Sequence, residues 1–466
     1  MGGFFGVVSD SDCVPDLFYG TDYHSHLGTM RGGMAVLNGE GFQRSIHDIT
    51  NTQFRSKFED DLGDMQGPLG IGVISDNEAQ PLLINSRHGD YGIVTVGRIN
   101  NLEALVQQAL ENNGVHFSEM TRGRVNPTEL VAHLIDQGET FQDGIRLAQE
   151  RIEGSCSLLV LNRDGIIAAR DRLGRTPVIV GEKDGARAVT FESCALPNLG
   201  YSVDRFLGPG EVVHVTTEGV EQLTPPGDRM QICAFLWVYY GYPASSYEGI
   251  NVEAVRYRCG AALEKRDDVE VDLVAGIPDS GTGHAIGYAN ASGRPYGRPF
   301  VKYTPTWPRS FMPQDQRVRD LVARMKLIPI RDLMEGNRLV FCEDSIVRGT
   351  QLQDIIQRVF DYGAREVHMR PACPPLVYGC KFLNFSQSRS EMDLAGRRAA
   401  HQVEGGEPED LSQYTDPDSP AYCAMVEAIR ERLGLTSLRY QRLDDLVEAI
   451  GLPKEKLCTY CWDGVE

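Results

Sequence analysis

The chain is short of positive charge, with 46 Lys and Arg residues against 65 Asp and Glu residues and a formal net charge of -19. A surface of this sign repels phosphate backbones and anionic lipids, so we expect no nucleic-acid or membrane partner, although a small anion could still bind at a local basic site. No apolar run is long enough to cross a bilayer. The start, MGGFFGVVSD, also lacks the basic segment of a secretory signal. We therefore expect a cytoplasmic protein.

Two patterns divide the 466 residues. Up to about residue 225, short strands between Gly and Asn/Asp turns alternate with two helical stretches, at 101–114 and 126–138. This pattern indicates an α+β layered domain, expected over 1–228. Strands and helices then alternate, which favours an α/β domain with a parallel sheet over 229–390. We expect a polar, helical C-terminal segment over 391–466.

An acid pair, Glu343 and Asp344, follows an apolar strand in the stretch LVFCEDSIVRGTQ, residues 339–351. The next residues form a short turn with Gly349, and a helix is expected to start at Thr350. The backbone N–H groups of such a turn and the positive end of the helix dipole bind phosphate. Carboxylates accept hydrogen bonds from sugar hydroxyls and help to hold hydrated Mg²⁺. The stretch therefore predicts a sugar-phosphate site; the alternative is a solvated acidic turn.

The same stretch resembles the phosphoribosyl pyrophosphate (PRPP) motif of type I phosphoribosyltransferases, in the version found in the glutamine PRPP amidotransferase family. Glu343 departs from the two aspartates usual in this family. The segment from Asp279 to Thr282 is similar to its pyrophosphate loop. The resemblance implies an N-terminal-nucleophile-type glutaminase domain followed by a phosphoribosyltransferase domain. It implies PRPP binding by Asp279, Ser280, Gly281, Thr282, Glu343, Asp344, Ser345, Ile346, Val347, Arg348, Gly349 and Thr350, with Mg²⁺ at Ser280, Glu343 and Asp344.

Two segments of this chain resemble the flexible catalytic loop of the family: VKYTPTWPRSFMP and ARMKLIPI. The resemblance implies that Lys302, Arg309 and Lys326 lie near the departing pyrophosphate, with Arg309 and Lys326 as the catalytic residues. Basic side chains there stabilise the developing negative charge. The alternative is that these side chains are merely solvated. Residues 304–308 differ from the corresponding part of the family's loop. A transferase that acts on a different acceptor therefore remains an alternative.

Cys458 and Cys461 form a CxxC pair near the C-terminus, which is moderate evidence for a metal site. In one subgroup of the family, four cysteines bind a [4Fe-4S] cluster, and the matching positions here are Cys233, Cys380, Cys458 and Cys461. The resemblance implies such a cluster, with a structural role. Tetrahedral zinc and four unligated thiols are the alternatives.

The glutaminase chemistry of the family does not match at the front of the chain. Working members begin Cys-Gly-Ile-Val-Gly, whereas this chain reads Gly2-Gly3-Phe4-Phe5-Gly6. The family's oxyanion-hole Asn corresponds to Val96, which has no side-chain donor. The family's carboxylate-binding Arg has no counterpart around 73–75. We therefore expect a degenerate glutaminase site.

These features favour an amidophosphoribosyltransferase-like enzyme of purine biosynthesis that makes 5-phosphoribosylamine from PRPP and ammonia or a small amine. The resemblance also implies a homo-oligomer, either a dimer or a tetramer. The alternatives are a non-catalytic PRPP-binding regulator, or partner of a complete homologue, and a transferase for another acceptor.

Overall fold

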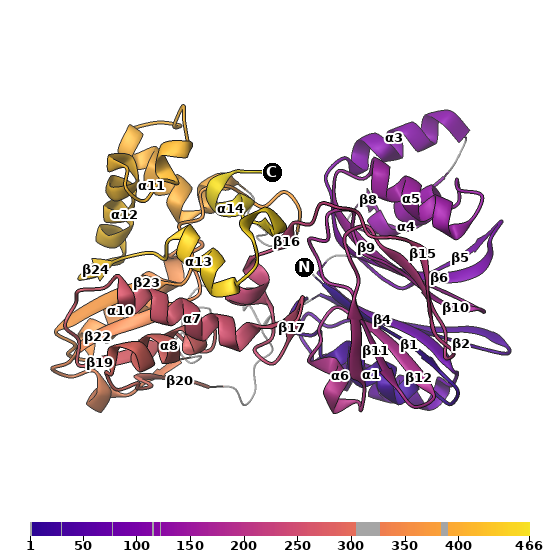
Figure 1. Cartoon of the computed structure of the whole chain (residues 1–466), viewed down its shortest axis with the longest axis horizontal. Coiled ribbons are helices and arrows are strands. Elements are labelled where there is room, and N and C mark those ends of the chain that lie inside the picture. The colour runs from indigo at the N-terminus through magenta and orange to yellow at the C-terminus, as the bar shows by residue number, and fades with distance from the viewer. Residues whose placement is uncertain are drawn as a thin grey trace.

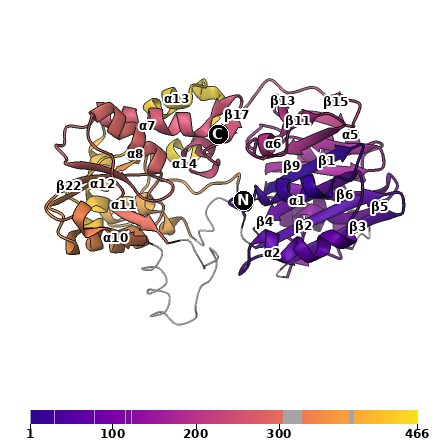
Figure 2. The ribbon, with the colours of Figure 1, turned by 90° about the horizontal axis from the view of Figure 1, so that it is seen from below.

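The computed structural model describes residues 2–28, 30–76, 78–113, 116–121, 123–303, 327–383 and 390–466. The N-terminal half and the remainder form two bodies that lie side by side, with both termini near the boundary between them (Figures 1 and 2). Among the described helices, none is long and apolar enough to cross a membrane.

Two antiparallel sheets build the N-terminal body (Figure 1). The first has the order β13-β11-β12-β1-β4-β2-β3 and the second β15-β14-β10-β9-β6-β5. In the first sheet the strands are β1 (Gly3–Ser9), β2 (Arg31–Asn38), β3 (Gly41–Asp48), β4 (Leu69–Ser75), β11 (Ile179–Lys183), β12 (Ala186–Thr190) and β13 (Ser202–Phe206). In the second they are β5 (Leu82–Ser86), β6 (Gly89–Ile99), β9 (Gly154–Asn162), β10 (Gly165–Ala169), β14 (Val212–Val215) and β15 (Val220–Thr224).

The first strand, β1, is buried on both faces. Phe4 and Val8 join a core with Leu159 and Ile166 of the second sheet. Phe5 and Val7 point the other way and pack with α1 (Val14–Asp22). Successive side chains of a strand point to opposite faces. The two sheets therefore pack face to face, and helices cover their outer faces.

The described residues of this body form six α-helices: α1, α2 (Phe54–Phe58), α3 (Leu102–Asn113), α4 (Pro127–Ile135), α5 (Phe141–Arg151) and α6 (Ala195–Asn198). Helices α3 and α4 confirm the two helical stretches expected from sequence. The Asn126 side chain caps α4 by accepting from the Thr128 N–H at 3.0 Å, and Pro127 opens the helix. The other four helices were not expected.

A four-stranded parallel sheet, of order β19-β22-β23-β24, forms the centre of the second body. Its strands are β19 (Leu273–Gly276), β22 (Arg338–Glu343), β23 (Glu366–Pro371) and β24 (Ser437–Leu438). Val340 and Cys342 face the cluster that contains α7 (Val252–Lys265) and α8 (Thr282–Ser292), whereas Leu339 and Phe341 face the cluster of α10 (Thr350–Asp361) and α12 (Pro420–Leu433). Helices thus cover both faces, as the alternating sequence pattern predicts.

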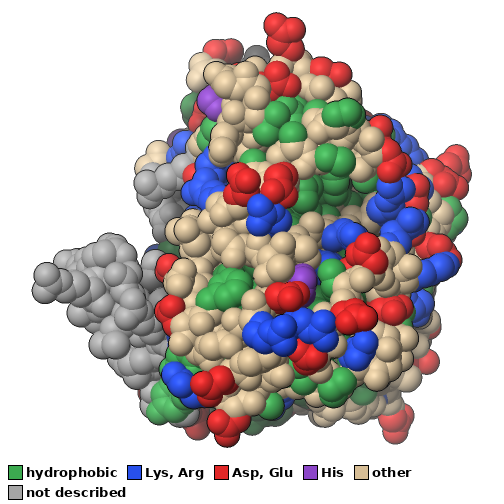
Figure 3. Space-filling model, turned by 90° about the vertical axis from the view of Figure 1, so that its left-hand side faces the viewer, with side chains coloured by type: hydrophobic (Ala, Val, Ile, Leu, Met, Phe, Trp, Pro, Cys, Tyr) green, Lys and Arg blue, Asp and Glu red, His purple; other side chains and the backbone are tan. Residues whose placement is uncertain are grey.

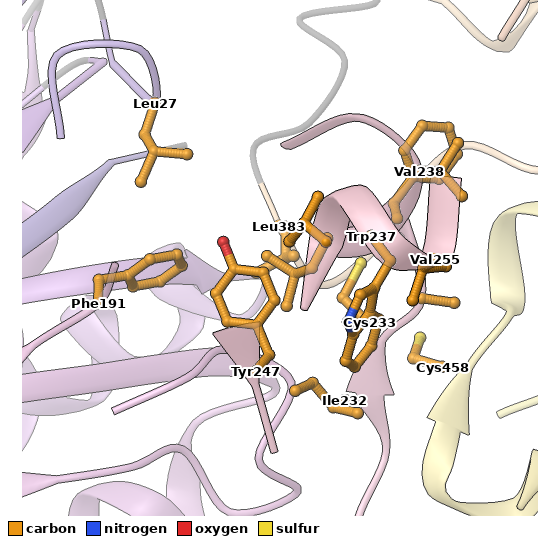
Figure 4. Close-up of a cluster of buried hydrophobic side chains, with 14 of the residues drawn as sticks. Leu27, Phe191, Ile232, Cys233, Trp237, Val238, Tyr247, Val255, Leu383 and Cys458 are labelled. Atoms are coloured by element: carbon orange, nitrogen blue, oxygen red, sulfur yellow. The ribbon is translucent and has the colours of Figure 1, made fainter. Parts of the chain in front are cut away.

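The C-terminal segment returns to the boundary between the two bodies. It contains α11 (Ala395–Glu404), α12, α13 (Leu443–Ile450), β25 (Leu457–Cys458) and α14 (Tyr460–Asp463). Strand β25 pairs in parallel with β16 (Ile232–Cys233), which follows the last strand of the N-terminal body. Figure 4 shows Trp237 and Tyr247 of the second body near Phe191 of the first, in one buried cluster. A continuous core therefore joins the bodies.

Candidate active site

The acid pair, Glu343 and Asp344, lies at the carboxyl end of β22, between β19 and β23. Both residues are buried, and the Ser280 hydroxyl donates to Glu343 Oε1 at 2.7 Å. This bond joins the loop after β19 to the loop after β22, because the carboxyl ends of parallel strands meet at one edge of the sheet. The structure thus brings together the three residues that were predicted to hold Mg²⁺.

Burial raises the pKa of the Glu343 carboxyl, and the neighbouring Asp344 carboxylate raises this pKa further. The Ser345 hydroxyl donates to Asp344 at 2.5 Å. Two adjacent acids away from water favour a ligand that brings positive charge or hydroxyl donors. The pair is therefore suited to a metal-bound sugar diphosphate.

The loop after the acid pair turns at Gly349, whose φ of +76° suits glycine, and α10 begins at Thr350. The first-turn N–H groups of a helix have no partner within it, so they are free to bind a phosphate. The Arg348 side chain points towards Asp393, at 3.7 Å.

The second loop, from Asp279 to Thr282, leads into α8, which begins at Thr282. Lys302, at the end of β20 (Phe300–Lys302), forms an ion pair with Asp279. Lys302 also pairs with Leu327, the first residue of β21 (Leu327–Pro329). Lys302 and Leu327, on either side of the segment outside the described residues, therefore lie next to this loop. Arg309 and Lys326 lie outside the described residues.

Two charged residues near the loops were missed in the sequence. The Glu253 carboxylate of α7 lies against Gly283 in the first turn of α8, within 2.8 Å of where a side chain at Gly283 would begin. Arg256 is buried and donates to the carbonyls of Trp237 and Gly241, at 3.1 and 2.9 Å. The sequence gave no signal that this part of α7 lies near the start of α8.

Four cysteines, the cysteine set, come from three segments: Cys233, Cys380, Cys458 and Cys461. Cys233 and Cys458 are neighbours in the β16–β25 pair, and Figure 4 shows their sulfur atoms beside Trp237 and Val255. The Leu383 N–H donates to Cys380 Sγ at 3.4 Å. Burial raises the pKa of the Cys461 thiol, and the nearby Cys380, Cys233 and Cys458 raise it further. The structure therefore gathers all four thiols in one place.

In the described part of the chain, no three His, Cys, Asp or Glu side chains are arranged to hold a single metal ion. None of the eleven cysteines forms a disulfide.

The N-terminal residues are tightly packed at Gly2 and Gly3. A Cβ at Gly2 would lie 2.2 Å from the Ile74 carbonyl oxygen, and one at Gly3 would lie 2.5 Å from the His24 ring. Val96 is buried in β6. His24 is also buried, and its Nε2 accepts from the Glu192 N–H at 3.1 Å. Burial lowers the pKa of His24 to about 4.

A buried carboxylate, Glu192, links this region to the second body. It contacts His26 Nε2 at 3.0 Å, accepts from the Tyr247 hydroxyl at 2.9 Å, and also accepts from the Ser245 hydroxyl. We call these four residues the Glu192 network. The sequence gave no signal for it, because its members come from three separate segments.

The comparisons with known proteins agree with this two-part structure. A family described as "Glutamine amidotransferase domain" matches residues 68–197. The amidophosphoribosyltransferase of Synechocystis sp. is 30% identical over 478 residues, which cover 99% of this chain and 90% of that protein. That of Methanothermobacter thermautotrophicus is 29% identical over 480 residues, covering 99% of this chain and 93% of that protein.

Among solved structures, glutamine PRPP amidotransferase from B. subtilis, complexed with ADP and GMP, superposes with a TM-score of 0.85 at 28% identity and covers 99% of this chain and 96% of that chain. These matches define the class: a glutamine amidotransferase-type domain joined to a phosphoribosyltransferase-type domain. The chain belongs to the amidophosphoribosyltransferase family.

Proposed function

We propose that the chain is a pentosyltransferase of purine biosynthesis that transfers nitrogen to C1 of PRPP and releases pyrophosphate, forming 5-phosphoribosylamine. The observation that carries this proposal is the bond from Ser280 to Glu343, which joins the two ligand loops at the buried acid pair. The family supports the same reaction class. We place the domain boundaries at 1–228, 229–390 and 391–466, and we propose a cytoplasmic homo-oligomer.

In the proposed reaction, the nitrogen lone pair forms a bond to C1 while the bond from C1 to the pyrophosphate oxygen breaks. The electron pair leaves with pyrophosphate, and the nitrogen then loses a proton. The loop of residues 345–350 holds the 5-phosphate with its backbone N–H groups, and the acid pair accepts hydrogen bonds from the ribose hydroxyls. Residues 279–282 hold the pyrophosphate at the start of α8. Arg309 and Lys326 stabilise its negative charge as it departs.

Mg²⁺ fits the acid pair, because this ion is usually held by one or two carboxylates together with substrate phosphates. Two carboxylates and the Ser280 hydroxyl meet at the site. When bound, Mg²⁺ neutralises phosphate charge.

We propose that the nitrogen comes from ammonia or a small amine rather than from glutamine. Gly2 stands where the nucleophile belongs, and the Ile74 carbonyl fills the space of a side chain there. Val96 supplies no side-chain oxyanion donor, and no Arg stands at 73–75 to hold the glutamine carboxylate.

The cysteine set fits a [4Fe-4S] cluster. Four thiols from three segments are gathered in a buried place, and a backbone N–H donates to one sulfur atom. Four cysteine thiolates are the usual ligand set of such a cluster. We propose that the set binds this cluster in a structural role.

Two measurements test the proposal. PRPP is titrated calorimetrically, with Mg²⁺, into the wild type, Asp344→Ala and the control Asp354→Ala, which lies on the exposed face of α10. Wild type and control should bind alike, and Asp344→Ala should bind at least about tenfold more weakly. Equal binding by all three would refute the site.

The second measurement supplies PRPP and Mg²⁺ with either glutamine or ammonium chloride. Pyrophosphate release with ammonium but not with glutamine supports the proposal. PRPP binding without turnover would favour the regulator, and turnover only with a larger amine would favour the other acceptor.

A further inference from the structure

A pocket lies behind the proposed PRPP loop, where α11 and α12 pack against it. Its apolar floor includes Ile346 of the loop, Ala399 of α11 and Leu433 of α12. The acid pair, Ser280 and Thr350 do not line it. The pocket therefore lies beside the site proposed for PRPP, and Ile346, Arg348 and Gly349 border both.

Three arginines from three segments surround this pocket: Arg348, Arg398 and Arg432. We call it the arginine pocket. Such a concentration of positive charge stands out in a chain with a net charge of -19. Basic and acidic side chains are interspersed over the face that carries α11 and α12, and they form no uniform basic field (Figure 3). The charge is thus local, and it suits a small anion better than a polyanionic surface.

Neighbouring carboxylates do not neutralise Arg432. Asp393 lies 3.7 Å from Arg348. Glu431, next to Arg432 in the chain, pairs with Arg430 instead, at 3.7 Å. The Arg432 side chain makes no hydrogen bond or ion pair with any other residue that the structure describes.

Arg398 is half-buried and only partly satisfied. It donates to the Arg348 carbonyl at 2.7 Å and to the Met392 carbonyl at 3.5 Å. A guanidinium has five N–H donors, so several remain available. Burial lowers the pKa of Arg398, and the positive Arg432 lowers it further. The two cations repel each other, and an anion between them would relieve this repulsion.

We infer that the arginine pocket binds a small phosphate-bearing anion between Arg398 and Arg432, behind the proposed PRPP loop. The planar guanidinium fork matches phosphate oxygens in pairs, and Gln402 at the rim offers an amide donor. The apolar floor accommodates an uncharged part of the ligand.

The pocket is tied to the loop by two hydrogen bonds from α11. Arg398 donates to the Arg348 carbonyl, and the Ala395 N–H donates to the Val347 carbonyl at 2.7 Å. Anion binding that repositions Arg398 therefore changes the loop, so occupancy of the pocket regulates PRPP affinity. This coupling rests on the proposed function, whereas the pocket itself does not.

The test uses inorganic phosphate as the probe and isothermal titration as the readout. The full-length wild type is compared with Arg432→Gln and with Arg163→Gln, which removes the same charge from an exposed turn of the N-terminal body. The titrations are run with PRPP and Mg²⁺ present at saturation, so that the loop is filled, and again without them. Wild type and Arg163→Gln should bind phosphate alike, and Arg432→Gln should bind it about tenfold more weakly.

Equal phosphate binding by all three proteins, or no binding to the wild type at millimolar phosphate, would overturn the pocket. For the coupling, the change in PRPP affinity caused by phosphate is compared between the wild type and Arg432→Gln. Phosphate that competes with PRPP for the loop does so equally in both proteins. A difference of about threefold between the two changes in PRPP affinity therefore supports coupling, and no difference overturns it. If PRPP does not bind at all, the proposed function fails, and the phosphate titrations without PRPP still decide the pocket.

Discussion

Gly2 lies in a crowded place of the N-terminal body. A side chain there would begin 2.2 Å from the Ile74 carbonyl oxygen, so something must shift. We predict that Gly2→Cys destabilises the protein by about 1–3 kcal/mol and yields no glutaminase activity. Gly39→Cys is the control, because no atom lies within 4 Å of its new side chain. Chemical denaturation and glutamate release measure the two effects; glutamate release near one per second would contradict the assignment.

His24 predicts a second effect at the residue scale, the loss of stability in acid. Burial lowers its pKa from 6.5 to about 4 in the folded protein. The unfolded chain therefore binds a proton that the folded chain does not, so this contribution is fully present above pH 6.5 and is lost as the pH falls towards 4. The loss amounts to about 3 kcal/mol at most. The unfolding free energy between pH 7 and 4 should fall less steeply in His24→Gln than in the wild type or His401→Gln, and equal slopes would contradict this.

Helix α5 shows at the element scale why some of the fold could not be predicted from sequence. The stretch FQDGIRLAQER contains Gly144, which lowers helix propensity, and so no helix was expected. In the structure, a Cβ at Gly144 would lie 2.0 Å from the Ile135 carbonyl oxygen of α4. The glycine allows two helices to cross closely, which is a tertiary requirement. The helices with clear caps or periodicity, such as α4 and α10, were predicted because their signals are local.

The crossing of α4 and α5 predicts the effect of a small substitution. Gly144→Ala improves helix propensity but forces the helices apart, so we expect a net destabilisation of about 1–3 kcal/mol. Gly63→Ala is the matched control, because no atom lies within 4 Å of its Cβ position. Urea denaturation of the two variants measures the difference. A Gly144→Ala variant as stable as the wild type would show that the crossing relaxes freely.

The candidate site also has parts that could be predicted from local sequence motifs and parts that depend on tertiary contacts. The acid pair and both glycine loops were predicted because each is a continuous motif at the end of a strand. Arg256 was not, because its carbonyl partners, Trp237 and Gly241, lie in another segment of the second body. The Glu192 network was not, because its partners meet only after the two bodies pack. Arg170 of the first body, for example, pairs with Glu248 of the second at 2.8 Å.

At the scale of the whole molecule, a cluster bound by the cysteine set would tie the C-terminal segment to the chain between the two bodies. Cys233 lies in β16, Cys458 in β25, and Cys380 lies next to Lys381, whose carbonyl accepts from Asn100 of the N-terminal body at 2.6 Å. Anaerobically purified protein should therefore be brown and contain roughly four irons per chain. Removing the iron should loosen residues 457–466, because two of the four proposed ligands, Cys458 and Cys461, lie in this segment.

Hydrogen exchange of residues 457–466, with and without iron, measures this loosening. Cys458→Ser should expose the segment as iron removal does, whereas Cys423→Ser, at an exposed thiol away from the set, should not. Stoichiometric zinc without iron would contradict the cluster. Unchanged exchange after iron loss would contradict its structural role, because the β16–β25 pair would then hold the two bodies and the C-terminal segment together by itself.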